Sequence, residues 1–194
     1  MLFRSRTLRE IYLASFEGAV KKSKPWTVMS SYNRINGKFV GDNREYLTEI
    51  LRDEWGFDGY VVSDWGAVND RISALSAGLD LEMPPGDYEN DRLIVKAVQD
   101  GKLDEQVVDQ ACERILDVIF RYTENRDEKA VFEYEKDHNA AADIAAECMV
   151  LLKNDNQILP LNGDKKIAFI GKYAREPRYQ GGGSSHINRS EERR

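Results

Sequence analysis

The stretch that decides the fold is FDGYVVSDWGA, at residues 57–67. Gly59 interrupts the preceding segment, residues 60–63 form a short apolar and β-branched run, and Asp64 follows directly. This pattern predicts a buried strand that presents a carboxylate at its carboxyl end. Parallel α/β folds carry their chemistry at that end of the strands, so Asp64 lies where a functional acid is expected. The residues alone leave a second interpretation open, in which Asp64 only caps a helix over residues 66–77.

Strand and helix patterns alternate on both sides of this stretch. Strands are predicted over 27–32, 60–64 and 79–83, and residues 33–42 are predicted to be a loop. Helices are predicted over 6–22, from a cap at Asp42 or Asn43 to Trp55, over 66–77, over 90–100 and over 104–122. Short connections between these elements are typical of βαβ units, and they predict an α/β fold with a parallel sheet.

The C-terminal third of the chain has a different composition. Residues 123–136 are charged and poor in aliphatic side chains, which predicts an interdomain linker. After it, Asp137 is expected to cap an alanine-rich helix that runs towards Leu152, and residues 166–171 are expected to form the first strand of a second α/β unit. A barrel of eight βα units takes about 250 residues, so the sequence predicts an internal fragment of a larger protein.

Composition narrows the classes of partner. The net charge of the 194 residues is 28 − 34 = −6, and no basic cluster offsets it, which disfavours nucleic acid and membrane surfaces as partners. No apolar run reaches the roughly 18 residues of a membrane span. Cys112 and Cys148 lie in helical patterns without metal-type spacing and are expected to be buried thiols, and two histidines are too few to suggest a metal site.

Six motifs carry a family resemblance. They are RTLREIYL (6–13), PWTVMSSYNRING (25–37), LRDEWGFDGYVVSDWGAVNDR (51–71), AGLDLEMP (77–84), VLLKN (150–154) and QGGGSSHIN (180–188). Together they resemble glycoside hydrolase family 3, specifically its β-glucosidase branch. The resemblance implies a (β/α)8 TIM-type barrel followed by an α/β sandwich domain. On this basis residues 1–122 are the C-terminal part of the barrel with its last three βα units, 123–136 the linker, and 137–194 the truncated start of the sandwich.

The resemblance also implies roles for individual residues. Asp64, in the SDW motif, resembles the family's catalytic nucleophile, and Trp65 resembles an aromatic residue at the entrance subsite, with core packing as the alternative. Tyr32 ends the preceding strand one βαβ step earlier, so it is expected to meet Asp64 and the bound sugar. Met29 resembles a methionine near the sugar, although a core methionine fits nearly as well. Ser184 corresponds to a serine that reaches the sugar in some members, and a turn of small residues is the alternative.

Two acidic residues of the third predicted strand receive other roles. Asp80 and Glu82 alternate with apolar residues along it, so only one face of the strand can point inward. Asp80 is expected to make a structural hydrogen bond, and Glu82 to face the barrel mouth.

The predicted function is that of a fragment of a retaining exo-acting β-glucosidase. It would remove terminal β-linked glucose from an oligosaccharide or an aryl β-glycoside through a glycosyl-enzyme intermediate on Asp64, without a cofactor. The alternatives are a β-xylosidase or β-N-acetylglucosaminidase, a carbohydrate-binding protein or truncated product without turnover, and a nucleotide-binding module that uses residues 181–185. The last is disfavoured because that loop lacks the lysine and glycine spacing of a P-loop.

Departures from the family pattern qualify this interpretation. The family's sugar-gripping Lys-His pair and arginine would precede Arg6, and its general acid/base glutamate would follow residue 194, so the chain alone is expected to be inactive. Ser5 stands where the family usually has glutamate, and Arg189 where proline is common, so the two ends are expected to be foreign or misread. The sequence defines neither the preferred sugar, the oligomeric state nor the compartment, since any signal peptide would lie upstream.

Overall fold

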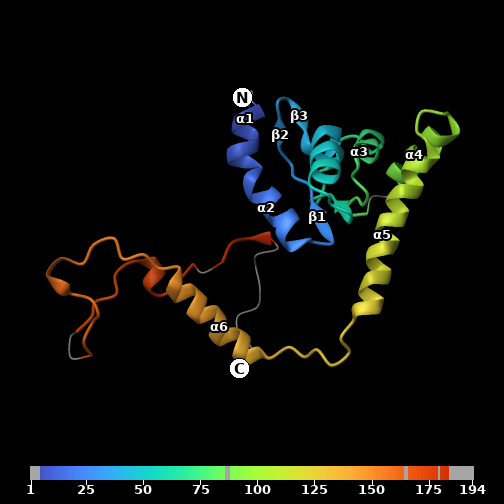
Figure 1. Ribbon diagram of the computed structural model, residues 1–194. Helices are drawn as coiled ribbons and strands as arrows, with labels where there is room; N and C mark the ends of the chain where they lie inside the picture. Colours follow the sequence, from blue (N-terminus) through green and yellow to red (C-terminus); the bar gives the residue numbers. More distant parts are fainter. Residues whose placement is uncertain (1–4, 86–87, 164–165, 179, 184–194) are drawn as a thin grey trace. The chain divides into compact units, whose positions relative to one another are not determined.

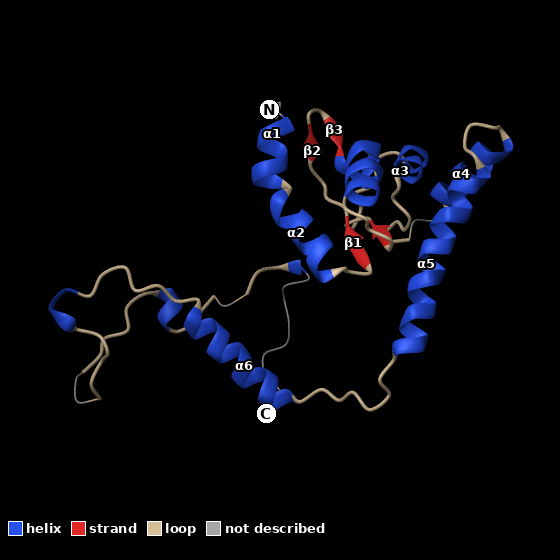
Figure 2. Cartoon of the chain, in the orientation of Figure 1, coloured by secondary structure: helices blue, strands red, loops and turns tan. Residues whose placement is uncertain are grey.

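The computed structural model describes residues 5–85, 88–163, 166–178 and 180–183 of the chain. The chain divides into two units, Met1–Ala130 and Val131–Arg194, and each is described by itself. Figure 1 follows the chain through both units, and Figure 2 shows that the strands lie in the first unit, among helices.

A small parallel sheet forms the centre of the first unit. Strand β1 (Thr27–Met29) pairs in parallel with β4 (Tyr60–Val62), with Val28 opposite Val61. Val62 in turn forms a parallel bridge with Leu81. Three consecutive segments of the chain therefore lie side by side and run in the same direction, which confirms the predicted α/β class with parallel strands.

The third predicted strand, over 79–83, is shorter than expected and consists of this bridge alone. The N–H of Ser63 donates to the carbonyl of Leu81 at 2.9 Å, but the N–H of Met83 donates to the Ser63 side-chain hydroxyl at 2.8 Å. A side chain thus takes the place of the next backbone partner, and the ladder ends there.

Gly59 allows β1 and β4 to start close together. A Cβ atom at this position would lie 1.9 Å from the carbonyl oxygen of Trp26, the residue just before β1. No side chain fits in that space, so the glycine is required by the close approach of two backbones rather than by a turn.

The loop predicted over 33–42 contains a hairpin instead. Strands β2 (Arg34–Ile35) and β3 (Lys38–Phe39) pair antiparallel, followed by the 3-10 helix η2 (Val40–Asp42). Asn36 and Gly37 connect the strands with φ angles of 52° and 89°. Positive φ at both central residues is the requirement of a type I′ turn, and Asn-Gly is its preferred pair. The Asn-Gly signal was therefore present in the sequence but was interpreted only as a loop.

Helices surround the sheet close to the predicted ranges. The predicted helix over 6–22 is formed by α1 (Ser5–Thr7), the π-helix η1 (Leu8–Tyr12) and α2 (Ala14–Ser23). The next one is the π-helix η3 (Glu45–Glu54), where the Asn43 side chain accepts from the N–H of Glu45 at 3.1 Å. Gly56, with φ 74°, lies just beyond its end. The later helices are α3 (Arg71–Ala77), α4 (Glu89–Gln99) and α5 (Glu105–Asn125).

The start of α3 corrects one prediction. The helix was expected from Gly66, but it begins at Arg71, because the Asp70 side chain accepts a hydrogen bond from the N–H of Ser73 at 2.7 Å and caps it. Residues 66–70 form the turn that leads into the helix. Asp64 is therefore not the cap of this helix, and the alternative role weighed for it is wrong.

The core of the first unit joins the sheet to its helices. Val61 and Leu79 are fully buried at its centre. Six further buried residues complete this cluster: Val20, Leu47, Leu51, Phe57, Ala74 and Ala77. A second cluster fixes α3 to α4 and α5 through Leu75, Ala97, Leu103 and Ala111. Because β4 is covered by these clusters, the position of its carboxyl end is fixed by the packing of the whole unit.

The second unit departs further from expectation. Its main element is α6 (Tyr134–Glu147), followed by the 3-10 helices η4 (Asp155–Gln157) and η5 (Lys172–Ala174). Asp137 is not the N-cap, because its own N–H donates to the carbonyl of Glu133 and it already lies in the first turn. The helix also stops short of Leu152.

The predicted strand over 166–171 is absent from the described part of the second unit. Residues 166–170 have no regular secondary structure, and Ile170 is 90% exposed. A strand needs a neighbour for its backbone groups, and no described residue of 131–183 supplies one. Cys148, on the same unit, and Cys112, on α5, are exposed rather than buried, because no described element covers their side chains.

Candidate active site

Asp64 is the second residue after β4, and Ser63, which lies between them, anchors it. Ser63 is fully buried, and its hydroxyl accepts from the N–H of Met83 at 2.8 Å and lies 3.2 Å from the Met83 carbonyl oxygen. The N–H of Gly66 donates to the same carbonyl at 2.9 Å. The residues on either side of the Asp64–Trp65 pair are thus tied to one backbone segment, which fixes the turn that carries the carboxylate.

Tyr32 and Asp64 meet at this turn. The phenolic hydroxyl of Tyr32 lies 2.9 Å from Asp64 Oδ1 and 2.9 Å from the carbonyl oxygen of Trp65. The same Oδ1 atom accepts from the N–H of Trp65 at 2.7 Å. The hydrogen bond to Asp64 is the main cause that raises the pKa of the Tyr32 phenol. Because its pKa is raised, the Tyr32 phenol stays a neutral hydrogen-bond donor to a higher pH than an ordinary tyrosine does.

Trp65 and Met29 lie in exposed positions. The side chain of Trp65 is 55% exposed, and that of Met29, the last residue of β1, is 51% exposed. Neither is part of a buried cluster of the first unit. The core-packing alternatives weighed for both residues therefore do not describe their environment within the described residues.

Asp80 lies behind the site and has the structural role expected of it. Its carboxylate accepts hydrogen bonds from Arg52 at 2.6 Å, from Arg114 at 2.9 Å and from the N–H of Val61 at 2.7 Å. Burial lowers the pKa of Arg52, and Asp80 opposes this effect. The carboxylate thus links η3, β4 and α5 beneath the strand that ends in Asp64.

Glu82 is held by neighbours. Its two oxygens accept from the Asn90 side chain at 2.7 and 2.9 Å, and Arg71 lies 3.5 Å away. These partners leave Glu82 in a structural network rather than free at the carboxyl end of the sheet.

The remaining predicted residue, Ser184, lies outside the described residues. Within the described ranges, no group of three or more His, Cys, Asp or Glu is arranged to hold a metal ion, and no helix has the length and apolarity to cross a membrane.

Sequence reasoning missed the arginines and Ser63. Arg52, Arg71 and Arg114 lie in helices that were interpreted through their apolar faces alone. A signal was available: an aspartate expected within a buried strand needs cationic or backbone partners, and Asp80 was such a residue. Ser63 gave no comparable signal, because a serine at the end of a strand has many ordinary uses.

These features define an α/β protein with a carboxylate at the carboxyl end of a parallel strand. The family model described as glycosyl hydrolase family 3 N terminal domain matches residues 3–118, and the one described as glycosyl hydrolase family 3 C-terminal domain matches residues 149–193. The chain therefore belongs to glycosyl hydrolase family 3.

Two named relatives are about half identical to this chain in sequence. The thermostable beta-glucosidase B of Acetivibrio thermocellus is 57% identical over 182 residues, which cover 94% of this chain and 24% of that protein. The exo-alpha-(1->6)-L-arabinopyranosidase of Bifidobacterium longum is 49% identical over an alignment of 195 positions, gaps included. This alignment covers 94% of this chain and 25% of that protein. The chain thus spans about a quarter of the length of these relatives.

Solved structures of beta-glucosidases also match this chain along nearly its whole length. Beta-glucosidase 3B from Thermotoga neapolitana, in complex with alpha-D-glucose, matches with a TM-score of 0.88 at 39% identity, over 97% of this chain and 28% of that one. A family 3 beta-glucosidase of Bifidobacterium adolescentis matches with a TM-score of 0.83 at 48% identity, over 95% of this chain and 27% of that one.

Proposed function

We propose that this chain is part of a retaining, exo-acting β-glucosidase in which Asp64 is the catalytic nucleophile. The observation that carries the proposal is the hydrogen-bonded group at the end of β4, where the hydroxyl of Tyr32 and the N–H of Trp65 both point at Asp64 Oδ1. Family membership and the names of the relatives support the reaction class. The proposal extends to the longer protein, because the chain matches only a quarter of its relatives.

The proposed chemistry has two steps. Asp64 attacks the anomeric carbon, the glycosidic bond breaks, and the leaving oxygen takes a proton from a general acid. Water, deprotonated by the same group, then attacks the anomeric carbon and releases Asp64. Two donors already in place restrict the direction in which the nucleophile points, and such preorganisation lowers the barrier. The general acid/base is expected from a glutamate later in the polypeptide, by the family resemblance.

The fold fits this role as a portion of a larger barrel. The parallel order of β1, β4 and Leu81 is consistent with the last three βα units of a (β/α)8 barrel. We assign residues 1–122 to that barrel, 123–136 to a linker and 137–194 to the start of a sandwich domain. In this arrangement Tyr32 and Asp64 stand at the barrel mouth, with Trp65 and Met29 beside them, and Ser184 keeps the substrate-binding role that the family resemblance implies.

A chimera tests the assignment. The chain replaces the matching segment of the A. thermocellus protein, and hydrolysis of nitrophenyl β-glucoside is measured with Asp64 or with Asp64→Ala. We expect Asp64→Ala to reduce kcat by several orders of magnitude, and azide to restore part of it by taking the place of the carboxylate. The anomer first formed by the unsubstituted chimera, followed by NMR, should retain configuration. Near-normal turnover by Asp64→Ala would refute the nucleophile assignment.

One comparison supports L-arabinopyranose as a second candidate sugar. The B. longum relative is named for α-(1→6)-linked L-arabinopyranose, a pentose without the hydroxymethyl group of glucose. Rates on nitrophenyl α-L-arabinopyranoside and on nitrophenyl β-glucoside, measured with the same chimera, separate the two. Sugar binding without turnover of either substrate would instead favour the carbohydrate-binding alternative.

A further inference from the structure

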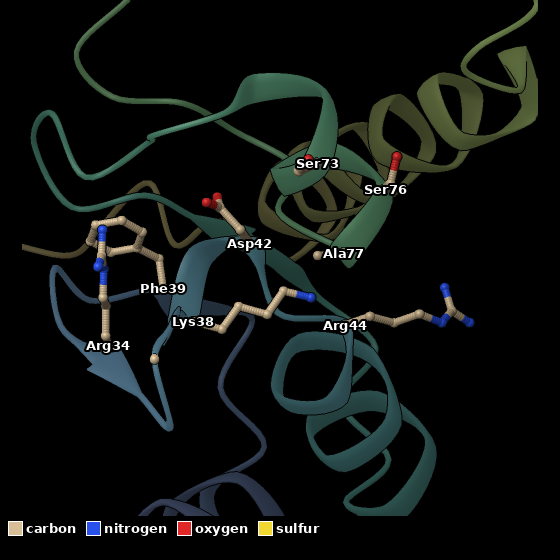
Figure 3. A pocket seen from close by; sticks show the side chains of 9 residues that line it. Arg34, Lys38, Phe39, Asp42, Arg44, Ser73, Ser76 and Ala77 are labelled. Atoms are coloured by element: carbon tan, nitrogen blue, oxygen red, sulfur yellow. The ribbon is translucent and has the colours of Figure 1, made fainter. Parts of the chain in front are cut away.

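A second polar site lies apart from the Tyr32 and Asp64 group. A pocket of about 510 Å³ opens between the β2–β3 hairpin, the start of η3 and helix α3, and we call it the hairpin pocket (Figure 3). Its polar lining residues are Arg34, Lys38, Asp42, Arg44, Ser73 and Ser76. The volume lies in the range of small-molecule sites, which is about 300–1,000 Å³.

The charge of the lining is opposite to that of the chain. Three cationic side chains and one carboxylate give the lining a formal charge of 3 − 1 = +2, whereas the whole chain carries −6. Arg34 lies on β2, Lys38 on β3 and Arg44 just before η3, so three neighbouring segments bring these cations to the rim of one pocket. Arg34 pairs with Phe39 and Ile35 with Lys38 in the hairpin, so the Arg34 and Lys38 side chains leave it on opposite faces. The concentration of positive charge is thus a product of the local fold.

The cations are poorly neutralised by the protein itself. Within the described part of the chain, neither Arg34 nor Lys38 forms an ion pair with a carboxylate. Arg44 reaches Glu49 at 3.7 Å, but both side chains are more than half exposed, and such a pair contributes little. Arg34 lies over the ring of Phe39, with its guanidinium carbon 4.0 Å from the ring centre, which holds it at the pocket without neutralising it.

Asp42 supplies an acceptor beside these donors. Its carboxylate makes no hydrogen bond with any described residue, and its Oδ1 atom is shielded from solvent. Burial, together with the nearby Asp70, raises the pKa of Asp42, and Lys38 partly opposes the rise. An uncompensated carboxylate is most readily satisfied by a hydroxyl or ammonium donor. The pocket therefore offers cations for a negative group and one acceptor for a hydroxyl group.

We propose that the hairpin pocket binds a hydroxyl-bearing anion of about hexose size, the chemistry that a sugar carboxylate and a sugar phosphate share. The anionic group pairs with Lys38, which extends between Arg34 and Arg44 (Figure 3), and these two arginines add longer-range attraction. Ring hydroxyls donate to the exposed face of Asp42 and bond with Ser73 or Ser76. This site is independent of the nucleophile, since none of its lining residues contacts Tyr32 or Asp64 through a hydrogen bond in the described chain.

Calorimetric titration of the 194-residue chain tests the proposal with four probes: glucuronate, glucose 6-phosphate, glucose and inorganic phosphate. Both sugar anions should bind at least about tenfold more tightly than glucose or phosphate, because only they engage both halves of the pocket. The tighter of the two identifies carboxylate or phosphate as the preferred anion. The titration is repeated with the chimera, whose activity reports folding, so that weak binding caused by unfolding is recognised.

Three variants locate the binding. Lys38→Ala should weaken both sugar anions by about tenfold or more without changing hydrolysis, whereas the control Lys22→Ala, on the exposed face of α2, should change neither. Trp65→Ala should leave this binding intact. Equal binding of phosphate or of glucose, absence of binding to the active chimera, or a loss with Trp65→Ala but not with Lys38→Ala would overturn the proposal. An inactive chimera that still binds the sugar anions would instead leave this site standing and count against the proposed function.

Discussion

The hydroxyl of Tyr32 lies at the same distance, 2.9 Å, from Asp64 Oδ1 and from the carbonyl oxygen of Trp65. A phenol has one hydrogen to donate, so the two acceptors share it. Tyr32 thus orients the carboxylate without fully engaging it, and the other oxygen of Asp64 has no hydrogen-bond partner among the described residues. This is a suitable arrangement for a group proposed to attack a sugar.

Removal of the hydroxyl should be costly but not fatal. In the chimera, Tyr32→Phe is expected to lower kcat/KM on nitrophenyl β-glucoside by about tenfold to a hundredfold, since a hydrogen bond to a charged group contributes about 1.5–3 kcal/mol. The control is Tyr60→Phe, on β4 itself, whose hydroxyl has no described partner. Equal losses in the two variants would mean that Tyr32 does not act through Asp64.

Trp65 should matter most for substrates with a second sugar. We expect Trp65→Ala to reduce kcat/KM for a disaccharide about tenfold more than for an aryl glucoside, because the exposed indole offers a flat face to the leaving sugar and an aryl group replaces part of that contact. The two kcat/KM values are measured on the same preparation. A uniform loss on both substrates would point to a disturbed turn instead.

Asp80→Ala should destabilise the fold strongly. The change leaves Arg52, whose side chain is 9% exposed, without its partner, and Arg114 loses the same carboxylate. Breaking a buried pair from one side typically costs about 3–5 kcal/mol. Urea unfolding of the chimera, followed by tryptophan fluorescence, measures the loss. In the control Glu10→Ala, the Arg6–Glu10 pair is exposed at 84% and 61%, and its removal should cost no more than about 0.5 kcal/mol.

Asp42→Asn should stabilise the protein in a pH-dependent manner. The folded state raises the pKa of Asp42, chiefly through burial, so the fold favours the protonated carboxyl. The stability from this group is present below the unfolded pKa and is lost as pH rises through the folded pKa. Asparagine carries no charge at any pH, so the variant should gain stability near pH 7 and lose that advantage below about pH 4. A gain that stays constant between these two pH values would contradict the assignment.

The sequence alone predicted those features that depend on the local chemistry of a single residue. Gly56 marked the end of η3, and Asp104 correctly marked the start of α5, because caps and positive φ angles depend on local chemistry. The apolar, β-branched run that forms β4 was equally clear, and with it the position of Asp64. Family motifs then supplied Tyr32, and the hydrogen bond between the two residues agrees with their spacing of one βαβ step.

Other features depended on contacts that local sequence does not encode. The sequence offered Asp64 as the cap of a helix from Gly66, whereas in the structure the Asp70 side chain reaches the N–H of Ser73 and caps a helix that begins later. The ladder beyond Leu81 was ended by the Ser63 hydroxyl, a tertiary contact. The strand expected over 166–171 needs a neighbouring strand, and apolar residues predict only the tendency to pair.

The close approach at Gly59 has a mechanical consequence. With the Trp26 carbonyl oxygen 1.9 Å from where a Cβ atom would stand, β1 and β4 can come this close only because residue 59 has no side chain. Tyr32 follows β1 and Asp64 follows β4, so a side chain at position 59 would force the two strands apart and carry these two residues away from each other. The 2.9 Å hydrogen bond between the phenol and the carboxylate therefore depends on the missing side chain at a position well outside the site.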